Sequence, residues 1–385
     1  MGLNSVVESK RIALTMGPGG VGKTTVAAAL GLQAAVLGRR ALVLTVDPAQ
    51  RLADALGLKD LDPGEIRELT VESLQAIGIP AKAPLHVSML DAEQAWRGLI
   101  QREVGEEGLK KRILEHPFFV RMTDDLSGAR EYAAMEELYH LHLRGGFDLL
   151  VLDTPPTIHG MDFLESPDRL LDVLEQDAFR WLMRPALLAG RMGLRVLNFH
   201  GGYVVRKLTR FTGVEFLRQL AQFIDLFSGL MEGFRARAAA VKATLRSAVT
   251  GFVVITAADP NLAQESAFLH RRLLQRDLSP EAVIVNRMAP EPPALPSGDD
   301  WKAQAKKALG PPDPAAWFAG MQKAHAILQQ LAERDQQHFE SLRQTMQSCC
   351  AFHKVKRLPV DIHNLAGLEL LRRALFEENA DHEST

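Results

Sequence analysis

The sequence predicts an α/β protein built on a doubly wound, mostly parallel β-sheet. Short apolar runs of strand length alternate along the chain with longer helical stretches, as crossover helices between parallel strands require. A glycine-rich turn separates the first of these runs from an apolar helix. Polar residues directly follow several runs, at the positions where open α/β sheets bind their ligands. With 385 residues and 46% hydrophobic content, we expect one domain of this kind over 1–385.

The glycine-rich turn is the most informative segment of the chain. It has the sequence GPGGVGKTT over 17–25, after an expected buried strand at 12–16 and before an apolar helix at 26–37. Its glycines let the backbone turn tightly and direct N–H groups at phosphate oxygens, and the helix N-terminus adds its dipole. In this pattern the lysine contacts the β- and γ-phosphates and the next hydroxyl binds Mg²⁺. The residues predicted to bind a nucleoside triphosphate are Gly19, Gly20, Val21, Gly22, Lys23, Thr24 and Thr25, and Thr24 is also the predicted Mg²⁺ ligand.

Two aspartates stand directly after further expected strands. Asp47 follows a strand expected at 40–46, and Asp153 follows one at 147–152. Asp153 occupies the position at which nucleotide hydrolases hold a carboxylate against the water shell of Mg²⁺, so we expect it to support the metal through water. Asp47 opens a proline-containing loop, which suits a carboxylate that moves toward the γ-phosphate and orients water. Lys23 and Asp47 are therefore the predicted catalytic residues.

Three more strands are expected in the C-terminal half of the chain. They are placed at 251–256, at 282–285 and at 355–359, and Asn286 follows the second of them. The glycine-rich loop, the two aspartates and Asn286 all lie at carboxyl ends of predicted strands. Because such ends meet at one edge of a parallel sheet, we expect a single site to collect them.

Two helical insertions and one proline-rich segment separate these strands. The insertions, at about 90–145 and 162–248, are too long for ordinary crossovers, and we expect them to form a helical subdomain. The proline-rich segment at about 289–316 predicts an exposed loop.

The second insertion carries an apolar stripe within a basic segment. Between 191 and 246 there are ten Arg or Lys residues and three Asp or Glu residues. One hypothesis is core packing, with long basic side chains extending to water. The other is a surface for a hydrophobic partner or an anionic membrane. The stripe, which recurs at alternating steps of four and three, consists of Phe216, Leu220, Phe223, Phe227, Leu230 and Phe234.

Composition excludes some classes of function. The formal net charge of −2 gives no reason to expect binding of nucleic acid. The sequence has no apolar run approaching 18 residues and begins without a hydrophobic leader, so we expect a cytoplasmic protein. Its only cysteines, Cys349 and Cys350, are neighbours that cannot build a disulfide framework. We expect them to be reduced and buried, with a functional thiol as the alternative.

Three motifs together resemble a known family. The loop at 17–25, the segment DPAQRL at 47–52 and the segment DTPPTIHG at 153–160 resemble the phosphate loop, switch I and switch II of the arsenical-pump and tail-anchored-protein-targeting ATPases. Segments at 118–139, 162–170 and 282–287 are similar to bacterial single-domain members often labelled anion-transporting ATPases. The resemblance covers nearly the whole chain. It implies a P-loop NTPase with a deviant Walker A motif.

The resemblance also implies roles for individual residues. It implies a dimer that closes around ATP and Mg²⁺, in which Asp47 positions the attacking water and Asp153 supports the metal. Asn286 would hydrogen-bond adenine, and residues near Pro359 would line the base pocket.

The chain departs from the family pattern in two places. Members usually carry a signature lysine after the first loop glycine, which reaches the partner's nucleotide, and this chain has Pro18 there. We therefore expect slow hydrolysis by a homodimer unless another cation, such as Arg51, substitutes. Zinc-bridged members carry Cys-x-x-Cys after the strand that ends in Asn, where this chain has its proline-rich loop. Arsenite and interfacial zinc are therefore not expected as ligands, because both need soft thiolates.

Our main hypothesis is a Mg²⁺-ATP-dependent dimeric switch ATPase that binds a hydrophobic helix or another membrane-protein client. The alternative is a low-turnover regulatory subunit that forms a heterodimer with a lysine-bearing homologue. The motor of an arsenite or anion pump is a third hypothesis. The sequence does not specify the client, the pathway or the role of the cysteines.

Overall fold

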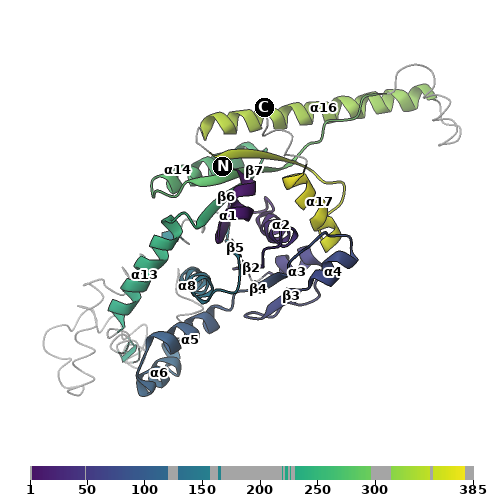
Figure 1. Ribbon diagram of the computed structural model, residues 1–385. Helices are drawn as coiled ribbons and strands as arrows, with labels where there is room; N and C mark the ends of the chain where they lie inside the picture. Colours follow the sequence, from purple (N-terminus) through teal and green to yellow (C-terminus); the bar gives the residue numbers. More distant parts are fainter. Residues whose placement is uncertain are drawn as a thin grey trace.

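The computed structural model describes residues 2–47, 49–119, 129–156, 164–165, 219, 222–223, 226, 230–295, 314–346 and 350–377. Its centre is an eight-stranded sheet with the strand order β3-β4-β2-β5-β1-β6-β7-β8. Figure 1 shows this sheet as a twisted layer between two groups of helices. Every neighbouring pair is parallel except β3 and β4, which are antiparallel. The predicted α/β class with a mostly parallel sheet is confirmed. The strands are β1 (Ile12–Met16), β2 (Ala41–Thr45), β3 (Ile66–Leu69), β4 (Leu85–Met89), β5 (Leu149–Asp153), β6 (Thr250–Ala257), β7 (Pro280–Met288) and β8 (Ala351–Lys356).

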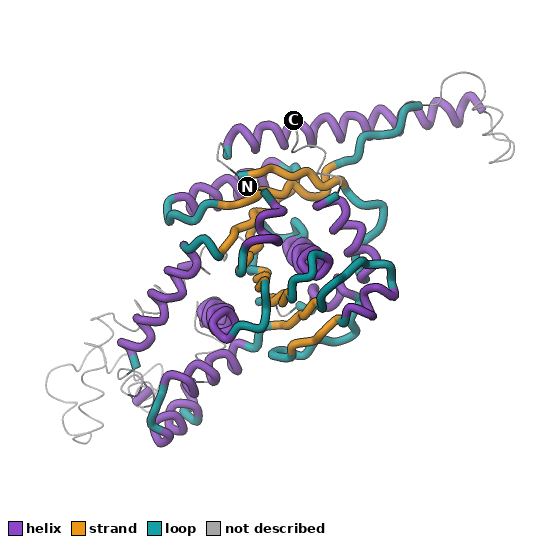
Figure 2. Tube along the Cα trace, in the orientation of Figure 1, coloured by secondary structure: helices purple, strands orange, loops and turns teal. Residues whose placement is uncertain are grey.

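Helices cover both faces of the sheet, because residues of the strands alternate between two apolar cores. In β1, Ala13 faces the first core, whereas Ile12 and Leu14 face the second. The first core is covered by α1 (Leu3–Ser9), α2 (Lys23–Val36), α3 (Arg51–Leu56), α4 (Val71–Ala76) and α17 (Leu365–Phe376). The second core is covered by α8 (Ala129–Arg144), α13 (Met231–Arg246), α14 (Pro260–Leu274) and α16 (Pro314–Thr345). Figure 2 shows the same division, with the orange strands between purple helices.

Helix α2 lies unusually close to the sheet. A side-chain Cβ placed at Gly31 would be 2.4 Å from Cγ2 of Val43 in β2, so only glycine fits there. The helix is apolar nearly all round, as a fully covered helix must be. This close packing fixes the position of the loop that precedes α2.

A third apolar cluster joins helices that lie away from the sheet. Helices α5 (Ala92–Glu103) and α6 (Glu107–Leu114) meet α8 and α13 there. Trp96 of α5 stacks on Tyr132 of α8 at 5.1 Å between ring centroids and donates a hydrogen bond to the carbonyl of Ala129 at 3.0 Å. Phe223 and Phe234 are buried in the same cluster. Among the described residues, these two members of the predicted apolar stripe therefore pack inside the protein, while Phe216, Leu220 and Phe227 lie outside the described residues.

The structure corrects several expected boundaries. The last strand is Ala351–Lys356 rather than 355–359, because its residues pair with β7 from Ala282 onward. Asn286 lies inside β7 rather than after it, and pairs with Ala257 of β6. Strands β3 and β4 were not predicted. The proline-rich loop ends before Pro314, where α16 begins, so its last three predicted residues are helical.

A serine at position 223 is expected to destabilise the fold. The Phe223 ring is 5% exposed and lies 5.3 Å from His116 and 6.3 Å from Phe118, measured between centroids. Replacing a buried aromatic side chain by a small one costs about 3–5 kcal/mol of stability. Phe223→Ser should therefore lower the free energy of unfolding, measured by urea denaturation, by about that amount. Phe268, which is 53% exposed, provides the control, and Phe268→Ser should change it by less than about 1 kcal/mol. Unchanged stability in Phe223→Ser, with loss of binding to an apolar helix, would instead favour a client surface.

Candidate functional site

The glycine-rich loop stands at the carboxyl end of β1 and has a backbone that only glycine accommodates easily. Gly17, Gly20 and Gly22 have φ angles of +152°, +77° and +94°. A Cβ at Gly17 would lie 1.9 Å from the carbonyl oxygen of Ile255, and one at Gly22 would lie 2.7 Å from Nδ2 of Asn286. These values explain why glycines stand at both positions. The loop leads directly into the N-terminus of α2, so its N–H groups and the helix dipole favour an anion.

Lys23 is the first residue of α2 and is folded back over the loop. Its Nζ donates a hydrogen bond to the carbonyl oxygen of Pro18 at 2.9 Å, and the residue is only 7% exposed. Burial lowers the pKa of its ammonium group, and the nearby Asp153 carboxylate opposes that shift. The positive charge is therefore held against the loop, where phosphate oxygens would accept from it in place of the Pro18 carbonyl.

Asp153 connects the loop helix to the neighbouring strand. Its Oδ2 accepts hydrogen bonds from Thr24 Oγ1 at 2.6 Å and from Thr45 Oγ1 at 3.0 Å. Its Oδ1 is buried and has no hydrogen-bond partner among the described residues. Burial, opposed by the bonds from the two threonines, raises the pKa of Asp153 to about 6. A hydroxyl beside a buried carboxylate with one unused oxygen is a donor set suited to Mg²⁺ and its water shell. Thr24 and Asp153 therefore fit the predicted metal site.

Asp47 stands just beyond β2, on the segment that leads to α3. Its backbone N–H donates to Thr45 Oγ1 at 3.2 Å, and its Oδ1 accepts from the N–H of Ala49 at 2.9 Å. Its Oδ2 lies 3.4 Å from Nη1 of Arg51, whose side chain is 61% exposed. Charge on both Asp47 and Arg51 affects the pKa of Lys23, which places these groups around the same site.

Asn286 of β7 contacts the glycine-rich loop. Its Nδ2 donates to the carbonyl of Val21 at 2.8 Å, and its Oδ1 accepts from the N–H of Arg287 at 2.9 Å. An amide has two donor hydrogens and two acceptor lone pairs, so one of each stays available. Arg287, which was not predicted, has a φ of +59° and donates from Nη1 to the carbonyl of Gly20 at 2.8 Å. A non-glycine residue with this backbone is often part of a functional site.

A cavity of about 460 Å³ opens beside Asn286. Pro359 is exposed and stands between the lining residues Leu358 and Val360. The cavity therefore connects the end of the phosphate loop to the segment after β8. Its lining also includes Gly22, Thr25, Arg287, Lys356 and Arg357.

The structure brings nearly all predicted site residues to one edge of the sheet. Loop residues 19–25, Asp153 and Asn286 are linked by the contacts above, and Asp47 reaches them through Thr45. Thr45 and Arg287 were missed by sequence reasoning. The position of Arg287 directly after Asn286 could have indicated a role in the site. Thr45 gives no such signal in the sequence, because it is part of an apolar strand. Thr157, Ile158, His159 and Gly160 of the predicted switch II lie outside the described residues.

The described part of the chain lacks two features, a cluster of metal ligands and a membrane-spanning helix. No group of three or more His, Cys, Asp or Glu side chains that could hold a metal ion is found there. None of the helices there is long and apolar enough to cross a membrane. Cys350 is half-buried and forms no disulfide with a described residue, and Cys349 lies outside the described residues.

A mostly parallel sheet with a glycine-rich loop between its first strand and α2 defines the class of P-loop nucleotide-binding proteins. A sequence profile described as "Anion-transporting ATPase" matches residues 10–311. The chain belongs to this family of ATPases.

Curated relatives point to the same family. The chain is 27% identical over 295 residues to a "Putative arsenical pump-driving ATPase 1" of Aquifex aeolicus, covering 73% of this chain and 64% of the relative. It is 27% identical over 191 residues to an "ATPase ASNA1 homolog" of Entamoeba histolytica, covering 48% and 55%. It is also 24% identical over 282 residues to an "ATPase GET3" of Malassezia globosa, covering 72% of each chain. The chain spans about half to two thirds of the length of the first relatives it matches.

Proposed function

We propose that the protein is a Mg²⁺-dependent ATPase that acts as a dimeric switch, coupling its nucleotide state to a hydrophobic or membrane-associated client. The observation that carries the proposal is the contact between Thr24 and Asp153 beside the buried ammonium of Lys23. These groups would place a metal site and a phosphate site side by side, between the first turn of α2 and the end of β5. Family membership supports ATP as the nucleotide.

Each residue of the site has a task in this proposal. The loop N–H groups and Lys23 bind the phosphates and balance charge that develops on the γ-phosphate. Thr24 and Asp153 would hold Mg²⁺, the latter through water, and the bound metal would supply further positive charge to the phosphates. Asp47 orients the attacking water and accepts its proton.

The cavity beside Asn286 fits the base in the same proposal. The free donor and acceptor of the Asn286 amide match N7 and the N6 amino group of adenine, which an asparagine can bind in a bidentate way. Leu358 and Val360 provide apolar surface for the ring, and Pro359 stands between them.

Asp47→Asn tests the chemistry. The amide keeps the size of the side chain but cannot accept a proton, so we expect Mg²⁺-ATP affinity to be retained and hydrolysis to slow about 10²-fold or more. Asp54→Asn is the matched control, since Asp54 is exposed on α3 and should leave turnover unchanged. Steady-state phosphate release and calorimetric titration measure the two quantities. Equal turnover in Asp47→Asn and wild type would remove Asp47 from the mechanism.

A second candidate is a regulatory subunit with little turnover of its own. The observation that favours it is Pro18, whose ring carries no charge and whose nitrogen has no N–H to donate. A partner chain that retains the lysine would supply a cation to this chain's nucleotide, which makes a heterodimer the expected active form. Turnover of the purified chain alone distinguishes this candidate from the first.

Three observations bear on the nature of the client. The names of the relatives indicate either arsenical pumps or the GET3 type of ATPase. The sequence has only two cysteines, both in one place, which argues against a pump motor that senses arsenite through separated thiolates. Within the described residues the stripe residues Phe223 and Phe234 are buried, so a client surface would need the remaining members of the stripe.

A further inference from the structure

Strand β7 is irregular at the point where it meets the glycine-rich loop. Val285 pairs with Lys354 of β8 and Met288 pairs with Lys356, so β7 has one residue more than β8 over this stretch. The extra residue makes a β-bulge, and Arg287 adopts the left-handed backbone within it, with a φ of +59°. Bulges next to functional sites often turn a side chain in a new direction.

The bulge brings two consecutive side chains to the same loop. Along a regular strand, neighbouring side chains point to opposite faces of the sheet. Asn286 nevertheless donates from Nδ2 to the carbonyl of Val21 at 2.8 Å. Arg287 donates from Nη1 to the carbonyl of Gly20, also at 2.8 Å. The end of β7 therefore holds two consecutive peptide groups of the glycine-rich loop.

A held carbonyl also determines the direction of the N–H on the same peptide group. In a planar trans peptide, the C=O of one residue and the N–H of the next point in opposite directions. The carbonyls of Gly20 and Val21 are directed toward β7 by the bonds that they accept. The N–H groups of Val21 and Gly22 are therefore directed away from β7. They are among the loop donors that this motif offers to phosphate oxygens.

These two N–H groups lack an acceptor in the described part of the chain. Neither donates a backbone hydrogen bond there, although Val21 is only 1% exposed. Buried N–H groups are nearly always paired, so a donor left over in this loop points to an anion that binds there. On the same two peptide groups the acceptors face the sheet, and the donors face the proposed phosphate site.

We propose that Arg287 is a positioning residue of the phosphate site. Together with Asn286, it holds the loop in the conformation that presents the N–H groups of Val21 and Gly22 to a polyphosphate. This role rests on the proposed function, because it requires that the loop binds the phosphates of a nucleotide. It needs no contact between the guanidinium group and the ligand. Glycine would fit the left-handed backbone more easily, but it has no side chain to reach the loop.

The test measures binding of Mg²⁺-ATP and Mg²⁺-tripolyphosphate to the full chain by isothermal titration calorimetry. Tripolyphosphate has no base and no ribose, so it reports on the phosphate site alone. Arg287→Ala removes the guanidinium group, and Arg287→Gly also removes the strain of the left-handed backbone. Both variants should bind both probes about tenfold more weakly, the scale of one charged hydrogen bond. If Arg287 only shaped the bulge, Arg287→Gly would bind as tightly as the wild type.

Arg357→Ala is the matched control for charge. Arg357 is exposed and lines the same cavity as Arg287. Its backbone N–H donates to the carbonyl of Met288 at 2.7 Å, and among the described residues its guanidinium group contacts no carbonyl of the loop. Its loss should weaken tripolyphosphate binding by less than about twofold, because water and salt screen an exposed charge.

Urea unfolding checks that each variant is folded, and Arg287→Gly carries the test if Arg287→Ala is not. Three results would overturn the positioning role: unchanged tripolyphosphate affinity in the folded variants, weaker binding of ATP alone, or equal weakening in Arg357→Ala. Each of them leaves the proposed function intact, because the wild type still binds both probes. Failure of the wild type to bind either probe would contradict the proposed function as well.

Discussion

Pro18→Lys is expected to raise steady-state ATP hydrolysis about 10³-fold in a homodimer of this chain. The lysine would bring a positive charge to the γ-phosphate bound by the partner, and cations supplied in this way are worth about 10³–10⁵ in rate where arginine fingers have been measured. Position 18 belongs to the loop, and its carbonyl already contacts the buried ammonium of Lys23. Phosphate release under saturating Mg²⁺-ATP measures the effect.

The control is Pro18→Ala, which removes the ring without adding charge and should leave the slow rate as it is. Arg51 is the other cation that could act across a dimer, since it is 61% exposed and only 3.4 Å from Asp47. Arg51→Ala in the wild-type background separates the two explanations. The opposite result would be fast ATP hydrolysis by the wild type, a lower rate in Arg51→Ala and no increase in Pro18→Lys. It would show that Arg51 supplies the charge in place of the lysine.

Lys23→Ala is expected to weaken Mg²⁺-ATP binding about 10²- to 10⁴-fold. The ammonium would contact both the β- and γ-phosphates, and each charged hydrogen bond contributes about 1.5–3 kcal/mol, or at least about tenfold in affinity. Burial of Lys23 increases the effect, because the alanine leaves the phosphates facing a low-dielectric loop with less compensating charge. Calorimetric titration with Mg²⁺-ATP gives the affinity directly.

Lys82→Ala is the matched control for this variant, since Lys82 is exposed and outside the site. Its affinity should equal that of the wild type. Unchanged affinity in Lys23→Ala would mean that the loop is not the phosphate site, and the assignment of Thr24 to the metal would fail with it.

That the predicted site residues come together could be foreseen because their signals are local. The glycines and Lys23 form one continuous segment, and each aspartate directly follows an apolar run. The parallel sheet then determines that these separate segments meet at one edge. The roles of Asp47 in catalysis and of Asn286 in base binding stay predictions.

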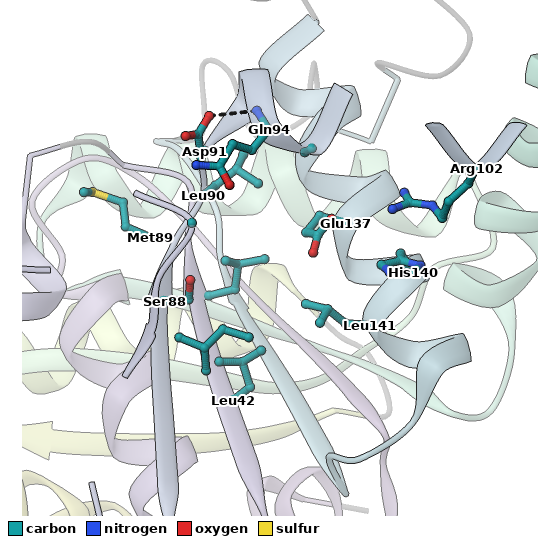
Figure 3. A pocket seen from close by; sticks show the side chains of 14 residues that line it. Leu42, Ser88, Met89, Leu90, Asp91, Gln94, Arg102, Glu137, His140 and Leu141 are labelled. Atoms are coloured by element: carbon teal, nitrogen blue, oxygen red, sulfur yellow. Dashed lines mark hydrogen bonds between the residues drawn. The ribbon is translucent and has the colours of Figure 1, made fainter. Parts of the chain in front are cut away.

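The missed features depend on contacts between distant segments. Strand β3 is an antiparallel edge strand of four residues with Ile66 42% exposed, so it has little apolar signal. Thr45 was hidden because a hydroxyl at the end of an apolar strand gains its role only when β2 lies beside β5. A pocket lined by residues of β2, β4, α5 and α8 (Figure 3) could not be predicted for the same reason, since these elements are far apart in the sequence.

The shared oxygen of Asp153 has a thermodynamic consequence. Thr24 on α2 and Thr45 on β2 both donate to it, and Thr45 in turn accepts from the backbone of Asp47. In the proposed function, Mg²⁺ would take a lone pair of the Thr24 hydroxyl while its O–H still donates to Asp153, so metal binding and the position of Asp47 would be linked through Asp153 and Thr45. Two events linked in this way are reciprocal. In the proposed function, any partner that favours one position of Asp47 would therefore change the affinity for Mg²⁺-ATP, and Mg²⁺-ATP would change the affinity for that partner by the same factor.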